Sequence, residues 1–313
     1  MSPPAPVAFI AGSWIAATGE TTWAHHNPAQ SAQILNNVPL AGPHTTRHAT
    51  RSTALLQKNW GQQPIAHRLA RLAAWKMNLE AREDEILELI ILEVGKPRSE
   101  ATEEFHRTLS HLDSVIRIVH EQLQPSDARD QPFRTLRHPV GTVLVITPWN
   151  NPLAIPVSKI AAALAFGNGV VWKPALQTPR LSILTGGRIP PHHQSGAWLE
   201  PTVIEALQPD SPLVTEELFA PVVTIQSCHD LDDAIALANG VTHGLMATLF
   251  SPLAADQERF LQEVEVGMLR VNPASFAISP DAPFIGWKRS ALGPPEHGSS
   301  DADFYSKIQV VYR

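Results

Sequence analysis

The sequence predicts an α/β protein in which a long helical region precedes strands that alternate with helices. Three features of the 313-residue chain support this class. Apolar residues recur at helical spacing between residues 45 and 124, and a strand–helix–strand pattern follows between residues 143 and 174. A second alternation of strands and helices runs from residue 222 to residue 272. Alternation of this kind is typical of parallel sheets with helices packed on their faces.

Composition excludes several classes of function. Hydrophobic residues make up 43% of the chain and charged residues 17%, which is enough apolar material for a buried core. The formal net charge is −6 without a basic block, which argues against nucleic-acid binding. A single cysteine excludes a disulfide framework and a cysteine-rich zinc site. The first residues do not have the pattern of a secretory leader, and no apolar run approaches ~18 residues, so we expect a soluble, cytoplasmic protein without a membrane partner.

The first forty residues are expected to form short strands and turns. Apolar runs at 7–10 and 13–16 flank Gly12, and Asn27-Pro28 interrupts the pattern that follows.

Helices are expected between residues 45 and 124, with Pro64 and Pro97 at helix starts and Gly95 at a helix end. The helix after Pro97 has an apolar residue every three or four positions, as an amphipathic helix requires. Its stripe consists of Ala101, Phe105, Leu109, Leu112, Ile116 and Val119. The adjacent Glu103 and Glu104 are expected on the solvated face, because consecutive helical positions diverge by about 100° and cannot share a proton.

The strand–helix–strand unit places polar residues at strand ends. The apolar run 143–146 is expected to be a buried strand, followed by a helix at 154–166 and a second strand at 170–174. Ligands of parallel α/β units bind at the carboxyl ends of the strands. We therefore expect a site at Thr147 to Asn150 and at Lys173.

The alternation of predicted strands and helices stops after Lys173 and resumes near residue 221. Strands are expected at 222–226, 245–250 and 268–272, and helices at 230–239 and 252–264, with Asp230 as an N-cap. The alternating residues 308–312 predict a final strand.

Six short strings, in order along the chain, resemble the aldehyde dehydrogenase superfamily. They are Glu93-Val94-Gly95-Lys96-Pro97, Ile146-Thr147-Pro148-Trp149-Asn150, Ala163-Leu164-Ala165-Phe166-Gly167-Asn168 continuing to Val171-Trp172-Lys173-Pro174, Leu199-Glu200-Pro201-Thr202-Val203, Glu216-Glu217-Leu218-Phe219-Ala220-Pro221 and Pro283-Phe284-Ile285-Gly286-Trp287-Lys288. The resemblance covers nearly the whole chain but leaves out the middle of the family pattern. Lys173 and Gly186 lie close together here, a deficit on the order of one domain, ~100–200 residues.

The resemblance implies a fold and a reaction. The fold would be a depleted Rossmann-like cofactor domain with N-terminal helices in residues 1–185, and a remnant of the catalytic domain in residues 186–313. Residues 134–140 and the C-terminal strand would form an oligomerisation arm. Family members oxidise an aldehyde to a carboxylate with NAD or NADP, through thiolate attack, hydride transfer and hydrolysis of the thioester.

The missing segment would remove three parts of that machinery: the helix N-terminus that faces the dinucleotide, the general-base glutamate and the catalytic cysteine. We therefore expect the oxidation to be lost and the binding of NAD or NADP to be weakened or lost.

The resemblance also assigns roles within the first half of the chain. Asn150 would be a vestigial donor to the oxyanion, in the same turn as the cofactor-binding Thr147 and Trp149. Lys173 would reach the adenosine ribose, although Leu176 replaces the glutamate that normally assists it. The residues alone also allow Asn150 to be a turn residue and Lys173 a solvated side chain.

In the second half, Glu217 and Phe219 would contact the nicotinamide ribose and ring. Ala220 and Ile285 stand where the family prefers glycine, which adds bulk where the backbone passes closely. A salt-bridged surface acid and a core phenylalanine remain the simpler interpretation of Glu217 and Phe219.

Two further candidates are expected to be structural. Cys228 is the only thiol and stands at a strand end before Asp230, and His229 beside it would point to the opposite face of a strand. His192-His193 is expected on a solvated loop, because no further metal ligand stands at a suitable spacing.

Three hypotheses follow. The chain is a family member without oxidative chemistry, or it uses Asn150 for a cysteine-independent carbonyl reaction. Alternatively, it is a structural partner that binds itself or an intact homologue through the C-terminal strand. In each case we expect apolar surface to be left exposed, with low solubility, oligomerisation or repacking of residues 143–146 against other elements as the result.

Overall fold

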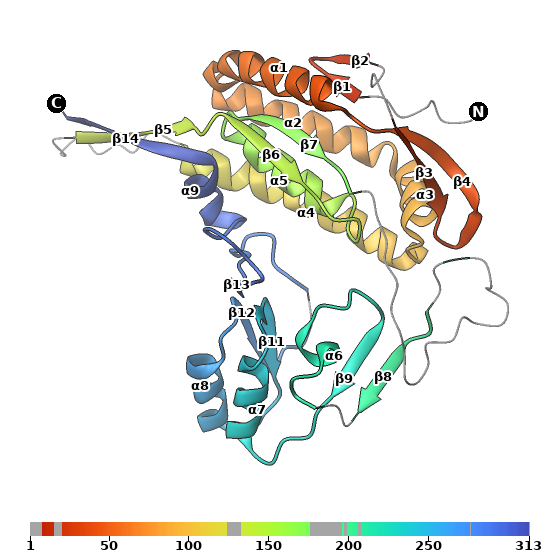
Figure 1. Cartoon of the computed structure of the whole chain (residues 1–313). Coiled ribbons are helices and arrows are strands. Elements are labelled where there is room, and N and C mark those ends of the chain that lie inside the picture. The colour runs from red at the N-terminus through yellow and green to blue at the C-terminus, as the bar shows by residue number, and fades with distance from the viewer. Residues whose placement is uncertain are drawn as a thin grey trace. The chain divides into compact units, whose positions relative to one another are not determined.

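The computed structural model describes residues 8–15, 21–123, 133–175, 196, 199–205, 208–275 and 277–312, and the chain divides into two compact units (Figure 1). The described part of the first unit comprises the residues up to 175, residue 196 and residues 297–312. The second unit comprises residues 199–296. The last sixteen described residues thus return to the first unit. The predicted boundary after residue 185 lies outside the described residues and stays a prediction.

Two small hairpins begin the chain, as the short apolar runs predicted. Strand β1 (Ala8–Ile10) pairs with β2 (Ser13–Ile15), and β3 (Thr22–Asn27) pairs with β4 (Gln30–Pro39), both antiparallel. Asn27 forms the second turn, because its Oδ1 accepts a hydrogen bond from the backbone N–H of Ala29 at 2.9 Å.

Four helices follow where helical periodicity predicted them: α1 (Pro43–Gln62), α2 (Ile65–Glu80), α3 (Glu83–Val94) and α4 (Arg98–Gln122). Gly95 ends α3 in the left-handed region at φ +76°, which a side chain would oppose. The apolar stripe of α4 faces the core as expected. Its four most deeply buried members are Ala101, Phe105, Leu112 and Val119.

The predicted strand–helix–strand unit is confirmed. Strand β6 (Thr142–Ile146), helix α5 (Ala154–Ala165) and strand β7 (Gly169–Lys173) follow one another, and the two strands are parallel. The register pairs Thr142 with Gly169 and Ile146 with Lys173. Helix α5 packs on α4 and α2 and contributes buried alanines to the main core.

Side chains from α1 and α2 cap the C-terminal end of α5, where the last carbonyl groups of a helix lack partners. Trp60 Nε1 donates to the carbonyl oxygen of Leu164 at 2.9 Å, and Arg68 Nε donates to that of Ala165 at 2.9 Å. Gln57 Nε2 donates to the carbonyl oxygen of Gly167 at 3.0 Å. The N-terminal helices therefore fix the helix that precedes β7.

The outer face of the β6–β7 sheet is largely uncovered. Leu144 is 61% exposed and Ile146 is 62% exposed, whereas the alternate residue Val145 is 4% exposed. Helix α1 covers only the start of this sheet, where Thr53 and Gln57 lie against Gly169. The expectation that the strand is buried on both sides is wrong for this face, since no further helix of the described residues covers it. The expected exposure of apolar surface is confirmed here.

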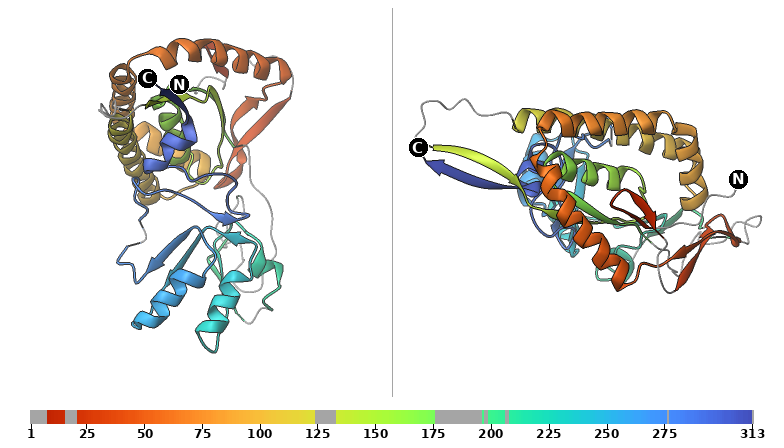
Figure 2. Two further views of the ribbon diagram at one scale, coloured as in Figure 1. Left: turned by 90° about the vertical axis from the view of Figure 1, so that its left-hand side faces the viewer. Right: turned by 90° about the horizontal axis from the view of Figure 1, so that it is seen from above.

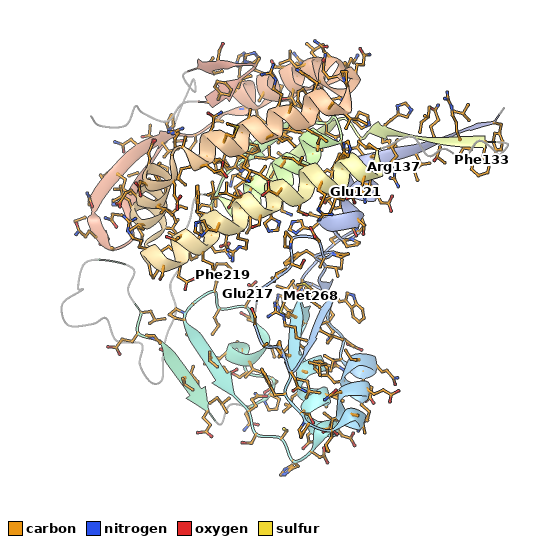
Figure 3. All side chains as sticks on the ribbon, turned by 180° about the vertical axis from the view of Figure 1, so that it is seen from behind. Glu121, Phe133, Arg137, Glu217, Phe219 and Met268 are labelled. Atoms are coloured by element: carbon orange, nitrogen blue, oxygen red, sulfur yellow. The ribbon has the colours of Figure 1, made fainter. Side chains whose placement is uncertain are left out.

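The C-terminal segment completes the first unit. It contains η1 (Gly298–Ser300), α9 (Asp301–Tyr305) and β14 (Ser306–Tyr312), which pairs antiparallel with β5 (Phe133–Pro139) in a long ribbon (Figure 2). Arg137, at the base of the ribbon (Figure 3), forms an ion pair with Asp303 at 2.8 Å.

Asn168 connects distant parts of the first unit. Its side chain is fully buried, its Oδ1 accepts from the N–H of Gly141 at 2.9 Å, and its Nδ2 donates to the carbonyl oxygen of Tyr305 at 2.9 Å. One side chain therefore joins the start of β6 to the returning segment.

The second unit is smaller and contains short paired strands. Its strands are β8 (Thr202–Glu205) parallel to β9 (Val222–Ile225), β10 (His243–Gly244) antiparallel to β13 (Trp287–Lys288), and β11 (Met246–Leu249) parallel to β12 (Met268–Val271). Its helices are α6 (Pro212–Thr215), α7 (Leu231–Asn239) and α8 (Ala254–Glu263). The core consists of Ile235, Phe260, Val264 and Val266. Asp230 caps α7 as predicted, since Oδ1 accepts from the N–H of Asp233 at 3.0 Å.

No helix in the described ranges of the chain has both the length and the apolar character that a membrane crossing requires.

Candidate functional site

The carboxyl ends of β6 and β7 are joined by hydrogen bonds, as the parallel unit predicted. The N–H of Thr147 donates to the carbonyl oxygen of Lys173 at 3.3 Å. Trp172 Nε1 donates to Thr147 Oγ1 at 3.0 Å, and Thr147 is 4% exposed. The side chain of Lys173 is exposed at the end of β7. Two of the predicted cofactor residues therefore lie at one sheet edge.

Asn150 lies in the turn that leads from β6 to α5, next to Trp149, and both residues are partly buried. Asn150 Oδ1 is buried, and no donor among the described residues reaches it. A buried acceptor without a hydrogen bond costs about 1–3 kcal/mol. The side-chain oxygen of Asn150 therefore accepts no hydrogen bond that would stabilise this turn within the described residues.

Asn151, the next residue, is held firmly. Its Oδ1 accepts from Arg107 at 2.8 Å and from Lys96 Nζ at 3.2 Å. Two cationic side chains therefore fix the turn immediately after Asn150.

Glu104 connects this arrangement to α5. The residue is 0% exposed, and its Oε2 accepts from Lys96 Nζ at 2.7 Å. Its Oε1 accepts from the backbone N–H groups of Leu153 and Ala154, each at 2.9 Å. The carboxylate thus caps the N-terminus of α5 from a different helix.

The expectation that both Glu103 and Glu104 are solvated is therefore wrong for Glu104, while Glu103 is exposed as expected. The rotation between consecutive helical residues turns Glu104 toward the core. Its charge is tolerated there because Lys96 and two N–H groups compensate it. The only sequence signal was the lysine eight positions earlier, in a string assigned to the family resemblance.

The position of Glu104 limits what the β6–α5 turn can bind. A helix N-terminus after a strand commonly holds a phosphate through its free N–H groups and its dipole. Here a protein carboxylate already accepts from two of those groups. The turn therefore offers a ligand the amide of Asn150 rather than an open anion site.

Glu217 and Phe219 belong to the second unit, on the segment between α6 and β9 (Figure 3). Both side chains are exposed, and Phe219 adopts a positive φ of +52°. Such a backbone is uncommon for a large residue and occurs often where a side chain is presented to a ligand. Phe219 is not the core phenylalanine of the simpler interpretation, because it is 47% exposed.

Cys228 lies on an exposed segment between β9 and α7 of the second unit, as the sequence predicted. His192 and His193 lie outside the described residues. In the described ranges no cluster of three or more histidine, cysteine or carboxylate side chains could hold a metal ion.

The α/β architecture and the polar turn after β6 are features of a nucleotide-dependent dehydrogenase fold. Comparison with protein families gives the family itself: the aldehyde dehydrogenase family matches residues 14–185 and 180–311, so the chain belongs to this family.

Curated relatives show how this chain differs from a full-length member. It is 22% identical over 473 residues to α-ketoglutarate semialdehyde dehydrogenase of Haloferax volcanii, covering 97% of this chain and 98% of the relative. At least 160 aligned positions (473 minus 313) therefore have no counterpart here. The chain is also 34% identical to 3,6-anhydro-α-L-galactose dehydrogenase of Streptomyces coelicolor over 188 residues, which cover 59% of this chain and 38% of that relative.

Solved structures share the fold. Betaine aldehyde dehydrogenase from Staphylococcus aureus in complex with NAD+ matches with a TM-score of 0.86 at 16% identity, covering 97% of this chain and 94% of that chain. A structure of 3,6-anhydro-L-galactose dehydrogenase matches with a TM-score of 0.88 at 18% identity, covering 97% and 98%.

Proposed function

We propose that this chain is an aldehyde dehydrogenase homologue that does not oxidise aldehydes by the covalent route of its family. The observation that carries the proposal is the position of the only thiol, Cys228, on an exposed segment after β9. The covalent route requires an activated thiolate beside the carbonyl group and a carboxylate that activates water. The missing positions relative to the Haloferax enzyme are consistent with the loss of both groups.

Weak or absent binding of the dinucleotide is part of this proposal. Structural homologues bind NAD+ or NADP. In this chain Thr147, Trp149, Lys173, Glu217 and Phe219 would be remnants of that site. Glu104 supports the proposal, because its carboxylate occupies the N-terminus of α5, the crossover helix of the β6–β7 unit, so that those N–H groups are not open to a phosphate.

Asn150 would be the remnant of the carbonyl-binding group, a donor to an oxyanion that no longer forms. The names of the relatives indicate semialdehydes and an anhydro sugar as the substrate class of the ancestor. A cysteine-independent carbonyl reaction at Asn150 is the alternative enzymatic function.

The test is an assay with short semialdehydes and betaine aldehyde, with NAD and NADP, followed by nicotinamide absorbance and by product analysis. We expect no turnover, and no binding of either dinucleotide at micromolar concentration in calorimetry. Turnover that Cys228→Ser abolishes would disprove the proposal. Turnover that survives Cys228→Ser and disappears in Asn150→Ala would establish the alternative.

A structural role is the second candidate, favoured by the ribbon of β5 and β14. Ile308, Val310 and Tyr312 alternate along β14 and are 58%, 47% and 78% exposed. Exposed apolar side chains on a strand with a free edge favour pairing with another chain. We propose that this strand binds a second copy or an intact homologue. Co-purification with such a homologue, lost in Val310→Asp and kept in Gln309→Asp, would support this role, and equal retention of both variants would disprove it.

A further inference from the structure

Two helices of the first unit each expose a pair of leucines. On α1, Leu55 is 71% exposed and Leu56 is 54% exposed. On α3, Leu89 is 42% exposed and Leu92 is 39% exposed. Large apolar side chains that gather on a helix surface commonly mark a contact with another protein.

Leu55 of α1 lies beside positive charges, whereas Leu56, one position later, is turned about 100° away from Leu55. The helix contains Arg47, Arg51 and Lys58 and has no acidic residue. Arg47, Arg51, Leu55 and Lys58 follow one another at spacings of four, four and three, so they share one helix face. None of the three cations has an ion-pair partner among the described residues. This basic face, Arg47 to Lys58, contrasts with the net charge of −6 of the whole chain.

The leucines of α3 lie among negative charges. The helix carries Glu83, Asp84, Glu85, Glu88 and Glu93. Glu85, Glu88, Leu89 and Leu92 share one face at spacings of three, one and three. The acids of the first turn are explained by the helix dipole, but Glu88 and Glu93 lie beyond it. Glu85 pairs with Arg82 and Glu88 with Arg98, and both pairs are exposed, so a partner can displace them at little cost.

We propose that the basic face of α1 docks on the acidic face of α3 in a second copy of this chain. The basic face combines Leu55 with three cations, the acidic face combines Leu89 and Leu92 with carboxylates, and the charges of the two faces are opposite in sign. Protein interfaces commonly combine apolar contacts with charges of opposite sign on the two partners. The second copy is the partner that supplies the matching face without any further component.

The basic face and the acidic face of one copy do not contact each other. Helix α1 packs mainly on β7 and β6, whereas α3 packs on α4 and β3, at the other end of α2 (Figure 1). The contact joins two different surfaces and is therefore heterologous. When one copy binds another, an unoccupied basic face remains at one end of the assembly and an unoccupied acidic face at the other. The expected product is a ring or an open chain of copies.

The test is sedimentation velocity of the full chain at about 20 mM and about 500 mM NaCl, because a charged rim is screened at high salt. We expect association at low salt, weakened about tenfold or more at high salt. Arg51→Glu should weaken the low-salt association about tenfold. The matched control is Arg289→Glu, which makes the same charge change at an exposed cation of the second unit and should leave association unchanged.

Mixing provides the decisive measurement. Arg51→Glu keeps an intact α3 face, and Glu88→Lys keeps an intact α1 face. An equimolar mixture should therefore form a heterodimer at low salt about as tightly as the unaltered chain associates, although each variant alone associates about tenfold more weakly. Pairing through β14 has neither this salt dependence nor this complementation.

The proposal is overturned if the unaltered chain shows no salt-dependent association. It is also overturned if Arg51→Glu and Arg289→Glu behave alike or if the mixture associates no more tightly than either variant alone. Binding of anionic phospholipid vesicles that Arg51→Glu abolishes, with association unchanged, would replace the second copy by a lipid surface.

Discussion

Lys96 and Glu104 form an ion pair of 2.7 Å whose carboxylate is wholly buried, and the same carboxylate holds the first N–H groups of α5. Glu104 therefore connects three parts of the first unit: its own helix α4, Lys96 in the segment between α3 and α4, and the N-terminus of α5. The candidate site depends on this connection, because Asn151 is bound by the same lysine.

Replacing Glu104 should destabilise the first unit strongly. Glu104→Ala leaves Lys96 without its partner and two N–H groups without an acceptor, and removing one member of a buried pair costs several kcal/mol. We expect a loss of about 3 kcal/mol in urea denaturation, because Lys96 retains some access to solvent. Glu103→Ala, one position away on the exposed face, should change stability by less than about 0.5 kcal/mol. Equal losses in the two variants would contradict the capping role.

Asn150 and Asn151 should differ sharply although they are neighbours. Asn151→Ala removes an acceptor shared by two cations and should cost about 2 kcal/mol in the same denaturation experiment. Asn150→Ala removes a buried oxygen that no described donor reaches, so it should be neutral or stabilising. A clear destabilisation by Asn150→Ala would mean that this side chain is structural.

The stability of the first unit should fall in acid because of His297. Burial and the charge of Lys159 lower the pKa of His297 from 6.5 to about 4, and its ring lies 5.0 Å from that of His111. The unfolded chain therefore binds more protons than the folded chain between these pH values. Above pH 6.5 the neutral His297 does not reduce the stability of the fold. As the pH falls from 6.5 to about 4, the free energy of unfolding should decrease by about 3 kcal/mol.

Thermal denaturation at a series of pH values measures this effect. His297→Gln should flatten the dependence of stability on pH between about 4 and 6.5. His229→Gln, at an exposed histidine of the second unit, is the control and should leave the slope unchanged. An unaltered slope in His297→Gln would show that other groups cause the acid sensitivity.

The exposed apolar face of β6 should lower the solubility of the protein, that is, the concentration above which it aggregates. Leu144→Thr should raise the solubility. It should change the free energy of unfolding by less than about 0.5 kcal/mol, because Leu144 is 61% exposed. Val145→Thr places a hydroxyl in the core and should cost about 1–3 kcal/mol. Light scattering and urea denaturation measure the two effects. A monomer that stays dispersed at high concentration and unfolds cooperatively would show that the exposed face has no such effect.

The sequence was most informative where local rules decide the structure. Gly95, Pro97, Asp230 and the α4 stripe predicted helix ends and buried faces, because a helix end or an amphipathic face is encoded within a few residues. The strand–helix–strand unit followed from the same kind of pattern, with limits correct to about two residues.

Contacts between distant residues were not predictable in this way. Local spacing puts Glu104 on the solvated face, because its partners Leu153 and Ala154 lie nearly fifty residues away in the sequence. Strand β8 appeared only as a family string, since four residues give little periodicity. Likewise, nothing local in the C-terminal segment reveals that it rejoins the first unit.

This return has a consequence for biosynthesis. Strand β5 pairs along its whole length with β14, and Asn168 bonds the carbonyl oxygen of Tyr305. Both partners are synthesised long after the helices of the first unit, because the whole second unit lies between them in the sequence. The nascent chain therefore holds the unpaired edge of β5 until residues 306–312 have been synthesised, and chaperones that bind exposed strand edges should retain the chain during that interval.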